Sequence, residues 1–318
     1  MLSNLPVEMI LLICQYPEFK DLGQLAWTNK RMMQIVKRYL PTALERKTLF
    51  YLDYENNNIK EGRICLFDSH NISVDYTTKF TNHLWSYEVA TTKDKIFALN
   101  SKEEIFEIFD LDTRQINRGP DPPEWRSAAF VAYYKDKLYY LGGKDPKTYK
   151  DTNRVNILID GTWQTGPAFP LPIISAQTIT RDGILYVIDE WVSQKIFRLS
   201  DDERGWIEVG QIGERRSTFA VASLNGKIYI TGGANSIDPN ALKSCLRFDP
   251  SAPVGSRSSR IADMNYARKY HSLVVANGRL YAIGGFNNCR PFVLCKAIEE
   301  YDPTRNEWKV VGEIPNNF

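Results

Sequence analysis

The chain has 318 residues, enough for about two ordinary domains or for one large β domain with a small extra segment. It carries 40 Lys and Arg against 38 Asp and Glu, and a formal net charge of +2 gives no general attraction to nucleic acid or to an anionic membrane. The hydrophobic content of 43% is that of a folded globular protein and excludes a disordered chain.

The longest apolar run, residues 9–14, is too short to cross a bilayer, and no secretory signal pattern is present. The five cysteines form no Cys-x-x-Cys pair, which argues against a disulfide framework and against a zinc site. We therefore expect reduced thiols in the cytoplasm or the nucleus, with no membrane partner and no nucleic-acid partner.

Residues 5–39 carry the periodicity of helices. Leu5, Met9, Leu12 and Ile13 are spaced as on one helix face, and two further short helices fit the residues up to Tyr39. Three short helices cannot bury a core of their own, so they need a partner surface. We expect a helical domain at residues 1–40 and a linker at 41–47.

The run LPVEMILLICQYPEFKDLGQLAWTNKRMMQIV resembles the F-box motif in its Leu-Pro opening and its later Lys-Arg pair. It departs from the motif at Pro17, where the family usually has Leu, and at Met32, where Trp is frequent. The resemblance implies docking onto the Skp-type adaptor of a Skp/cullin/F-box ubiquitin ligase. The alternative is a helical cap that packs on the next domain. The residues expected to bind the adaptor are Leu5, Pro6, Ile10, Ile13, Leu22, Leu25, Trp27 and Lys30.

Residues 48–318 repeat with a period of about 45 residues, the period of a four-stranded propeller blade. Each unit has an apolar strand, a tight turn and a second strand, and three second strands end in Gly-Gly. A tryptophan opens the fourth strand of several units, where an aromatic ring packs between neighbouring sheets. The aromatic residues that set the six repeats are Phe50, Phe97, Tyr139, Tyr186, Tyr229 and Tyr281.

The order Gly-Gly, then Tyr-Asp-Pro, then Trp is similar to the kelch repeat, and the similarity decays where Asn100-Ser101 and Asp189-Glu190 replace Gly-Gly. The predicted fold is mainly β: a six-bladed kelch-type β-propeller behind a small three-helix F-box segment. The first repeat shows three strands, so either its inner strand is absent or the register is shifted by one strand.

No catalytic constellation stands out in the sequence. The three histidines, His70, His83 and His271, fall in three different repeats without metal-ligand spacing, and Cys289 and Cys295 share a loop without a nearby histidine. We expect no catalytic residue, no metal site and no cofactor.

A recognition surface is the remaining candidate. Arg126, Arg216 and Arg268 precede the inner strands of three repeats, with Trp85 and Ile174 at the corresponding places of two others. Guanidinium groups suit carboxylate and phosphate, which suggests an acidic or phosphorylated target segment. The alternative is that these arginines bond blade carbonyls in the turns. The residues expected to contact a target are Trp85, Arg126, Arg215, Arg216, Arg268, Lys269, Tyr270 and Arg290.

The sequence thus predicts a non-catalytic substrate receptor of a Skp/cullin/F-box ligase, with the adaptor and cullin complex and a protein substrate as its partners. Two alternatives from other classes stay open: a propeller enzyme of the oxidase or glycosidase kind, and a kelch scaffold without a ligase role.

Overall fold

The computed structural model of the chain describes residues 47–55, 58–68, 72–80, 87–92, 94–111, 113, 115–191, 193–235, 240–287 and 293–314. The expected helical domain, its adaptor-binding residues and the linker up to residue 46 lie outside these residues. Within the described part, no helix has the length and apolar character needed to cross a membrane.

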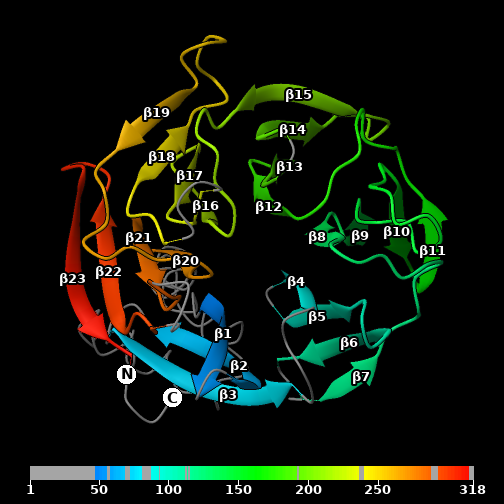
Figure 1. Cartoon of the computed structure of the whole chain (residues 1–318), viewed down its shortest axis with the longest axis horizontal. Coiled ribbons are helices and arrows are strands. Elements are labelled where there is room, and N and C mark those ends of the chain that lie inside the picture. Colours follow the sequence, from blue (N-terminus) through cyan, green and yellow to red (C-terminus); the bar gives the residue numbers. More distant parts are fainter. Residues whose placement is uncertain are drawn as a thin grey trace, which may run out of the picture.

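Antiparallel sheets stand around a common axis as a β-propeller (Figure 1). Five of the sheets have four strands, in the orders β4-β5-β6-β7, β11-β10-β9-β8, β12-β13-β14-β15, β16-β17-β18-β19 and β20-β21-β22-β23. The prediction of six blades was therefore wrong, since the structure has five. The first repeat instead forms a sheet of three strands, β1-β2-β3.

The bounds of the strands follow the repeat. The three-stranded sheet holds β1 (Lys47–Glu55), β2 (Asn58–Asp68) and β3 (Ser73–Phe80). The first two blades hold β4 (Tyr87–Thr91), β5 (Lys95–Asn100), β6 (Ile105–Asp110), β7 (Ile116–Arg118), β8 (Phe130–Tyr134), β9 (Lys137–Leu141), β10 (Val155–Ile159) and β11 (Thr162–Thr165). The other three hold β12 (Ala176–Arg181), β13 (Ile184–Asp189), β14 (Lys195–Leu199), β15 (Trp206–Gln211), β16 (Ala220–Leu224), β17 (Lys227–Thr231), β18 (Cys245–Phe248), β19 (Ser258–Ile261), β20 (Ser272–Ala276), β21 (Arg279–Ile283), β22 (Ala297–Asp302) and β23 (Glu307–Glu313).

The sheet of the first repeat has three strands among the described residues, one fewer than a blade. Phe67 of β2 packs on Tyr281 of β21 with ring centroids 5.1 Å apart, as Tyr301 of β22 packs on Tyr229 of β17 at 5.9 Å. The ring contact matches β2 to a third strand, whereas β1 lies against the inner strand β20, as the inner strands of neighbouring blades do. Among the described strands, β1 pairs with β2 alone.

Tight turns join the first two strands of each blade. Asn225-Gly226 and Asn277-Gly278 have positive φ at both positions, at 49° and 69° and at 49° and 70°. Such turns match the right-handed twist of the strands that they join, and Asn-Gly is the sequence that adopts them most readily. This local chemistry sets the hairpin register, which places Tyr229 and Tyr281 in the core between blades.

The Gly-Gly pairs allow neighbouring blades to approach closely. A Cβ on Gly142 would lie 2.2 Å from the carbonyl oxygen of Ile173, and one on Gly232 would lie 2.3 Å from that of Arg268. Both glycines also have positive φ, at 58° and 59°. A side chain is therefore excluded at these two places by contact and by backbone conformation.

The fourth-strand tryptophans bind the segments that link the blades, as predicted. Trp206 is 9% exposed and stacks on Phe169, with ring centroids 4.2 Å apart. Each indole N–H donates to a carbonyl in the segment before its own blade: Trp163 to Pro120 at 2.8 Å, Trp206 to Pro167 at 2.9 Å and Trp308 to Ala262 at 3.0 Å. The tryptophans belong to the core between blades.

Replacing Trp206 by Ala should lower the free energy of unfolding by about 3 to 5 kcal/mol, because a large buried ring and its hydrogen bond are lost together. Trp206→Phe should cost less, since it keeps part of the stacking on Phe169. Denaturant unfolding measures both losses, with Trp191→Ala as the exposed control that should change stability by less than about 0.5 kcal/mol. An equal loss of stability in Trp206→Ala and Trp191→Ala would contradict the assignment of Trp206 to the core between blades.

Candidate functional site

One face of the propeller carries both the loops after the second strands and the turns that lead into the inner strands. Isolated β-bridges join the two kinds of segment, as in Ser127 with Lys144, Ser217 with Ala234 and Lys269 with Phe286. We call this the loop face. Loops held on a rigid scaffold are the usual place for binding residues, and the turns with the predicted target-binding residues lie on this face.

Arg126 is fully buried beneath the loop face. Its guanidinium donates to the carbonyl of Tyr140 at 3.0 Å and to the Asn156 side chain at 2.8 Å, and it forms an ion pair with Glu124 at 3.0 Å. It also lies over the Tyr140 ring at 4.4 Å. Burial lowers the pKa of Arg126 and raises the pKa of Tyr140 to about 12. The residue stabilises its own blade.

Arg216 and Arg268 repeat this arrangement. Arg216 donates to the carbonyls of Gly232 at 3.0 Å and Ser244 at 2.9 Å. Arg268 donates to the carbonyls of Gly284 and Ala297 at 3.1 and 3.0 Å. Its ion pair with Glu299 at 2.7 Å is fully buried on both sides. Both guanidiniums therefore satisfy carbonyls between the second and third strands.

The burial of these three arginines corrects the expected anion-binding rim. Arg126, Arg216 and Arg268 are at most 1% exposed, so their guanidiniums are closed to a partner. The alternative, that they bond blade carbonyls in the turns, describes what is observed. The corresponding place in the β12–β15 blade is Ile173 rather than Ile174, because Gly143 donates to the carbonyl of Ile173 as Gly233 donates to that of Arg268.

The other predicted target-binding residues divide by exposure. Arg215 and Tyr270 are exposed on the loop face, and Tyr270 has a φ of 55° directly before β20. Lys269 is buried. Trp85 and Arg290 lie outside the described residues. The turn before β20 thus offers a tyrosine to a partner, and the turn before β16 offers an arginine.

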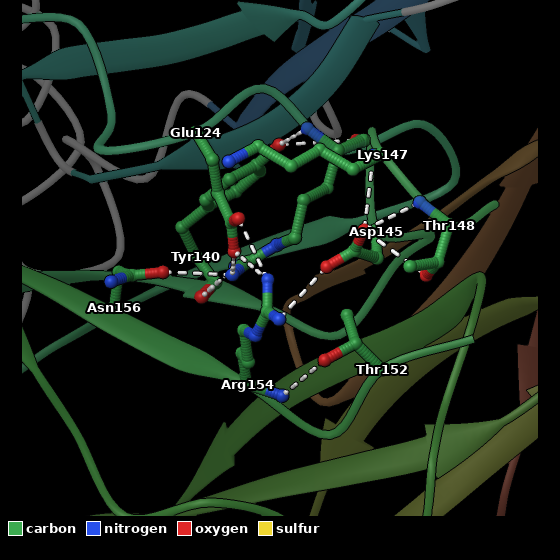
Figure 2. A network of polar contacts seen from close by, with 9 residues as sticks. Glu124, Tyr140, Asp145, Lys147, Thr148, Thr152, Arg154 and Asn156 are labelled. Carbon is green, nitrogen blue, oxygen red and sulfur yellow. Dashed lines mark hydrogen bonds and ion pairs between the residues drawn. The ribbon is translucent and has the colours of Figure 1, made fainter. Parts of the chain in front are cut away.

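Acidic residues connect two of the buried arginines to exposed ones. Glu124 binds both Arg126 and Arg154, which approaches it to 2.7 Å, and Arg154 also pairs with Asp145 at 2.8 Å (Figure 2). Burial would raise the pKa of Glu124, but the hydrogen bonds from the two arginines outweigh it and lower the pKa. Glu214 links Arg216 to Arg260 in the same way.

A second electrostatic feature follows from the loss of Gly-Gly at Asp189-Glu190. The Glu190 carboxylate accepts hydrogen bonds from Gln177 at 2.6 Å and from the backbone N–H of Thr218 at 3.0 Å, so it spans two blades. Burial raises the pKa of Glu190 to about 7. Burial also raises the pKa of Glu88 on β4 to about 8, and the charge of Glu190 adds to this shift.

The described residues do not fit a catalytic metal centre of the oxidase kind. They contain no group of three His, Cys, Asp or Glu side chains that could hold a metal ion. His271 is buried with its Nε2 2.8 Å from the Thr231 hydroxyl, and burial beside Arg268 keeps its pKa well below the usual value. Cys245 and Cys295 are buried free thiols.

Sequence reasoning missed the two large aromatic side chains exposed on the loops after second strands. Tyr149 is 77% exposed and Trp191 is 53% exposed. The sequence feature that could have indicated them is local. Each aromatic residue follows an aspartate, Asp145 or Asp189, at the start of a short polar loop. An aspartate at the start of a turn bonds the backbone N–H groups that follow and so fixes the loop.

Comparison with known proteins identifies the repeat. The Kelch motif matches residues 215–265 and 267–315. The last two blades of the propeller thus carry kelch motifs. Kelch repeat and BTB domain-containing protein 12 of Homo sapiens is 25% identical over 222 residues, 59% of this chain and 34% of that protein. Kelch-like protein 35 of Mus musculus is 33% identical over 104 residues, 32% of this chain and 16% of that protein.

The similarity extends to proteins of other names. Alpha-scruin of Limulus polyphemus is 31% identical over 132 residues, 39% of this chain and 13% of that protein. A solved copper-containing fungal alcohol oxidase aligns with a TM-score of 0.57 at 13% identity, over 84% of this chain and 63% of its own. The alignments span 34% of the human relative, 16% of the mouse relative and 13% of alpha-scruin. At 13% identity the oxidase shows the fold alone.

Replacing Arg268 by Met should lower the free energy of unfolding by about 3 to 5 kcal/mol, because Glu299 is left charged and buried without its partner. The double variant Arg268→Met, Glu299→Met should lose less than the two single losses added together. A double-mutant cycle in denaturant measures this coupling. Additive losses would show that the pair does not interact.

Stability should also depend on Glu88 and Glu190. Because the folded state holds their protons up to about pH 8 and 7 while the unfolded chain releases them near 4.5, the free energy of unfolding should fall as the pH rises through this window. In the double variant Glu88→Gln, Glu190→Gln, the free energy of unfolding should fall less steeply as the pH rises. Urea unfolding at pH 5, 6, 7 and 8 measures the two slopes, and parallel slopes would contradict the assignment.

Proposed function

We propose that this chain is a substrate-recognition subunit of a Skp/cullin/F-box ubiquitin ligase. The observation that carries the proposal is the combination of the F-box-like run at residues 5–36 with a kelch-type propeller. The human relative joins kelch repeats to a BTB domain, as its name states, which gives a precedent for a kelch propeller beside a second module. In this chain the F-box-like segment takes that place.

The mechanism is proximity and requires no chemistry from the propeller itself. The F-box-like helices hold the Skp-type adaptor and thereby the cullin complex, and the propeller holds a protein target. A target lysine kept near a ubiquitin-charged enzyme reacts as if intramolecularly, so its effective concentration rises. The residues that we assign to the adaptor contact are Leu5, Pro6, Ile10, Ile13, Leu22, Leu25, Trp27 and Lys30.

The loop face is the proposed target surface, and an acidic or phosphorylated segment is the proposed target. Exposed Arg215 and Tyr270 are the predicted residues that can reach a partner there. Exposed Lys147 and Lys150 add positive charge on the loop after β9. The three buried arginines support this surface from below. We propose that the protein is localised in the cytoplasm or the nucleus, together with the other ligase components.

Replacing both Leu5 and Pro6 by Ala should weaken capture of a purified Skp-type adaptor at least about tenfold, because two apolar contacts of a small interface are lost. The melting temperature of the propeller should stay unchanged. Val254→Ala, on an exposed loop of the propeller, is the matched control and should bind the adaptor as the unaltered chain does. An unchanged affinity of the double variant would reject the F-box role and favour a kelch scaffold.

A further inference from the structure

Two neighbouring blades each present one large aromatic side chain to solvent on the loop face. Tyr149 stands in the loop between β9 and β10, and Trp191 in the loop between β13 and β14. The inner strands of these two blades, β8 and β12, lie side by side, so the loops at the ends of their second strands belong to adjacent sectors of the same face.

The Tyr149 turn is fixed by hydrogen bonds. One carboxylate oxygen of Asp145 accepts from the backbone N–H groups of Lys147 at 3.0 Å and Thr148 at 2.8 Å (Figure 2). The other accepts from Arg154 at 2.8 Å. The Tyr149 N–H donates to the Asp145 carbonyl at 2.9 Å and holds the residue at a φ of 56°. The ring is thus exposed on an ordered backbone.

The Trp191 turn is fixed in a similar manner and is braced on the next blade. The buried Asp189 carboxylate accepts from the Trp191 N–H at 3.1 Å and from the N–H and hydroxyl of Ser193, the latter at 2.7 Å. Glu190 binds the N–H of Thr218 in the following turn, and Gln194 accepts from the N–H of Arg216 at 3.0 Å. The loop therefore cannot shift without breaking contacts between two blades.

Ordered aromatic residues of this kind are typical binding anchors. Tyr and Trp bring large contact area with few rotatable bonds, and a turn that is already ordered loses little entropy on binding. The charges nearby select the partner: exposed Lys147 and Lys150 flank Tyr149, and exposed Arg215 precedes the turn that braces the Trp191 loop. Asp145 itself is occupied by Arg154 and by backbone groups.

We propose that Tyr149 and Trp191 are the two anchors of the target-binding surface, and that the partner is a protein segment with apolar side chains beside acidic residues. The apolar side chains pack on the two rings, and the acidic residues lie against Lys147, Lys150 and Arg215. The assignment rests on the proposed use of the loop face as the target surface and names the residues that carry its affinity.

The test selects random 16-residue peptides from a phage-displayed library on the full chain, and measures their affinity by fluorescence polarisation. Tyr149→Ala and Trp191→Ala should each weaken the selected peptides about tenfold or more, the loss expected of an anchor residue. Tyr149→Phe should bind nearly as well as the unaltered chain, because the ring supplies the contact. Val254→Ala is the matched control, since this 85% exposed residue lies on the β18–β19 loop of the opposite face.

The selected peptides should be rich in Asp and Glu near aromatic or aliphatic residues, and Lys147→Glu with Lys150→Glu should weaken them and reduce the salt dependence of binding. Peptides without acidic residues, peptides insensitive to both alanine variants, or a library that yields no binder would each overturn the assignment. Adaptor capture is read separately: its failure with intact peptide binding rejects the ligase role alone, and intact capture with no peptide binding rejects the anchors alone.

Discussion

The buried arginine before each of three inner strands is the contact on which the loop face depends. The loop that joins the second and third strands of a blade has backbone carbonyls without a strand partner, and a buried carbonyl must be bonded. The guanidinium of Arg216 meets this need at Gly232 and Ser244. One side chain therefore fixes both the turn to which it belongs and the loop that it reaches.

The same contact joins neighbouring blades. Arg268 holds its own blade through its guanidinium, while its backbone carbonyl accepts from Gly233 of the preceding blade at 2.9 Å. That approach is the reason for the Gly-Gly pair, since a Cβ on Gly232 would strike the carbonyl of Arg268. The arginine and the glycine pair form one device for closing a seam. The charge of the Arg268 guanidinium is balanced locally by the Glu299 carboxylate, 2.7 Å away.

The sequence predicted the parts of the fold that depend on local chemistry. The tight turns between first and second strands and the fourth-strand tryptophans follow from local sequence, and the structure confirms them at Gly226, Gly278 and Trp206. The number of blades was not predictable in this way, because the first repeat forms a sheet of three described strands rather than a blade of four. A pattern of strands does not say which edge of a sheet is left unpaired.

The target surface was harder to predict, because residue type does not reveal burial. Arginine is usually exposed, and its recurrence in the turns indicated a rim for anions. The five N–H donors of a guanidinium serve equally well to bond several carbonyls at once. In this protein Arg126, Arg216 and Arg268 do so while buried. Tyr149 and Trp191 gave no periodic signal, since each occurs once, in a loop.

The β12–β15 blade departs from the repeat and also offers a large aromatic side chain, Trp191, to a partner. In the β12–β15 blade, Ile173 stands before the inner strand where three other blades have the buried arginine, and Glu190 replaces the second glycine after β13, so that a carboxylate rather than bare backbone bridges to Thr218 of the next blade. Side chains at these positions can then shape a loop that differs from those of the other blades. The Asp189 carboxylate does so by accepting a hydrogen bond from the Trp191 N–H, which holds the exposed Trp191 in place. A regular blade closes its seam with glycine and arginine and carries its recognition residue further along the loop, as Tyr149 does, whereas in the β12–β15 blade Trp191 stands directly beside the rebuilt seam. Specificity in such a ring is therefore expected in the loops that differ from blade to blade, because identical loops around an axis would present the same surface in every sector.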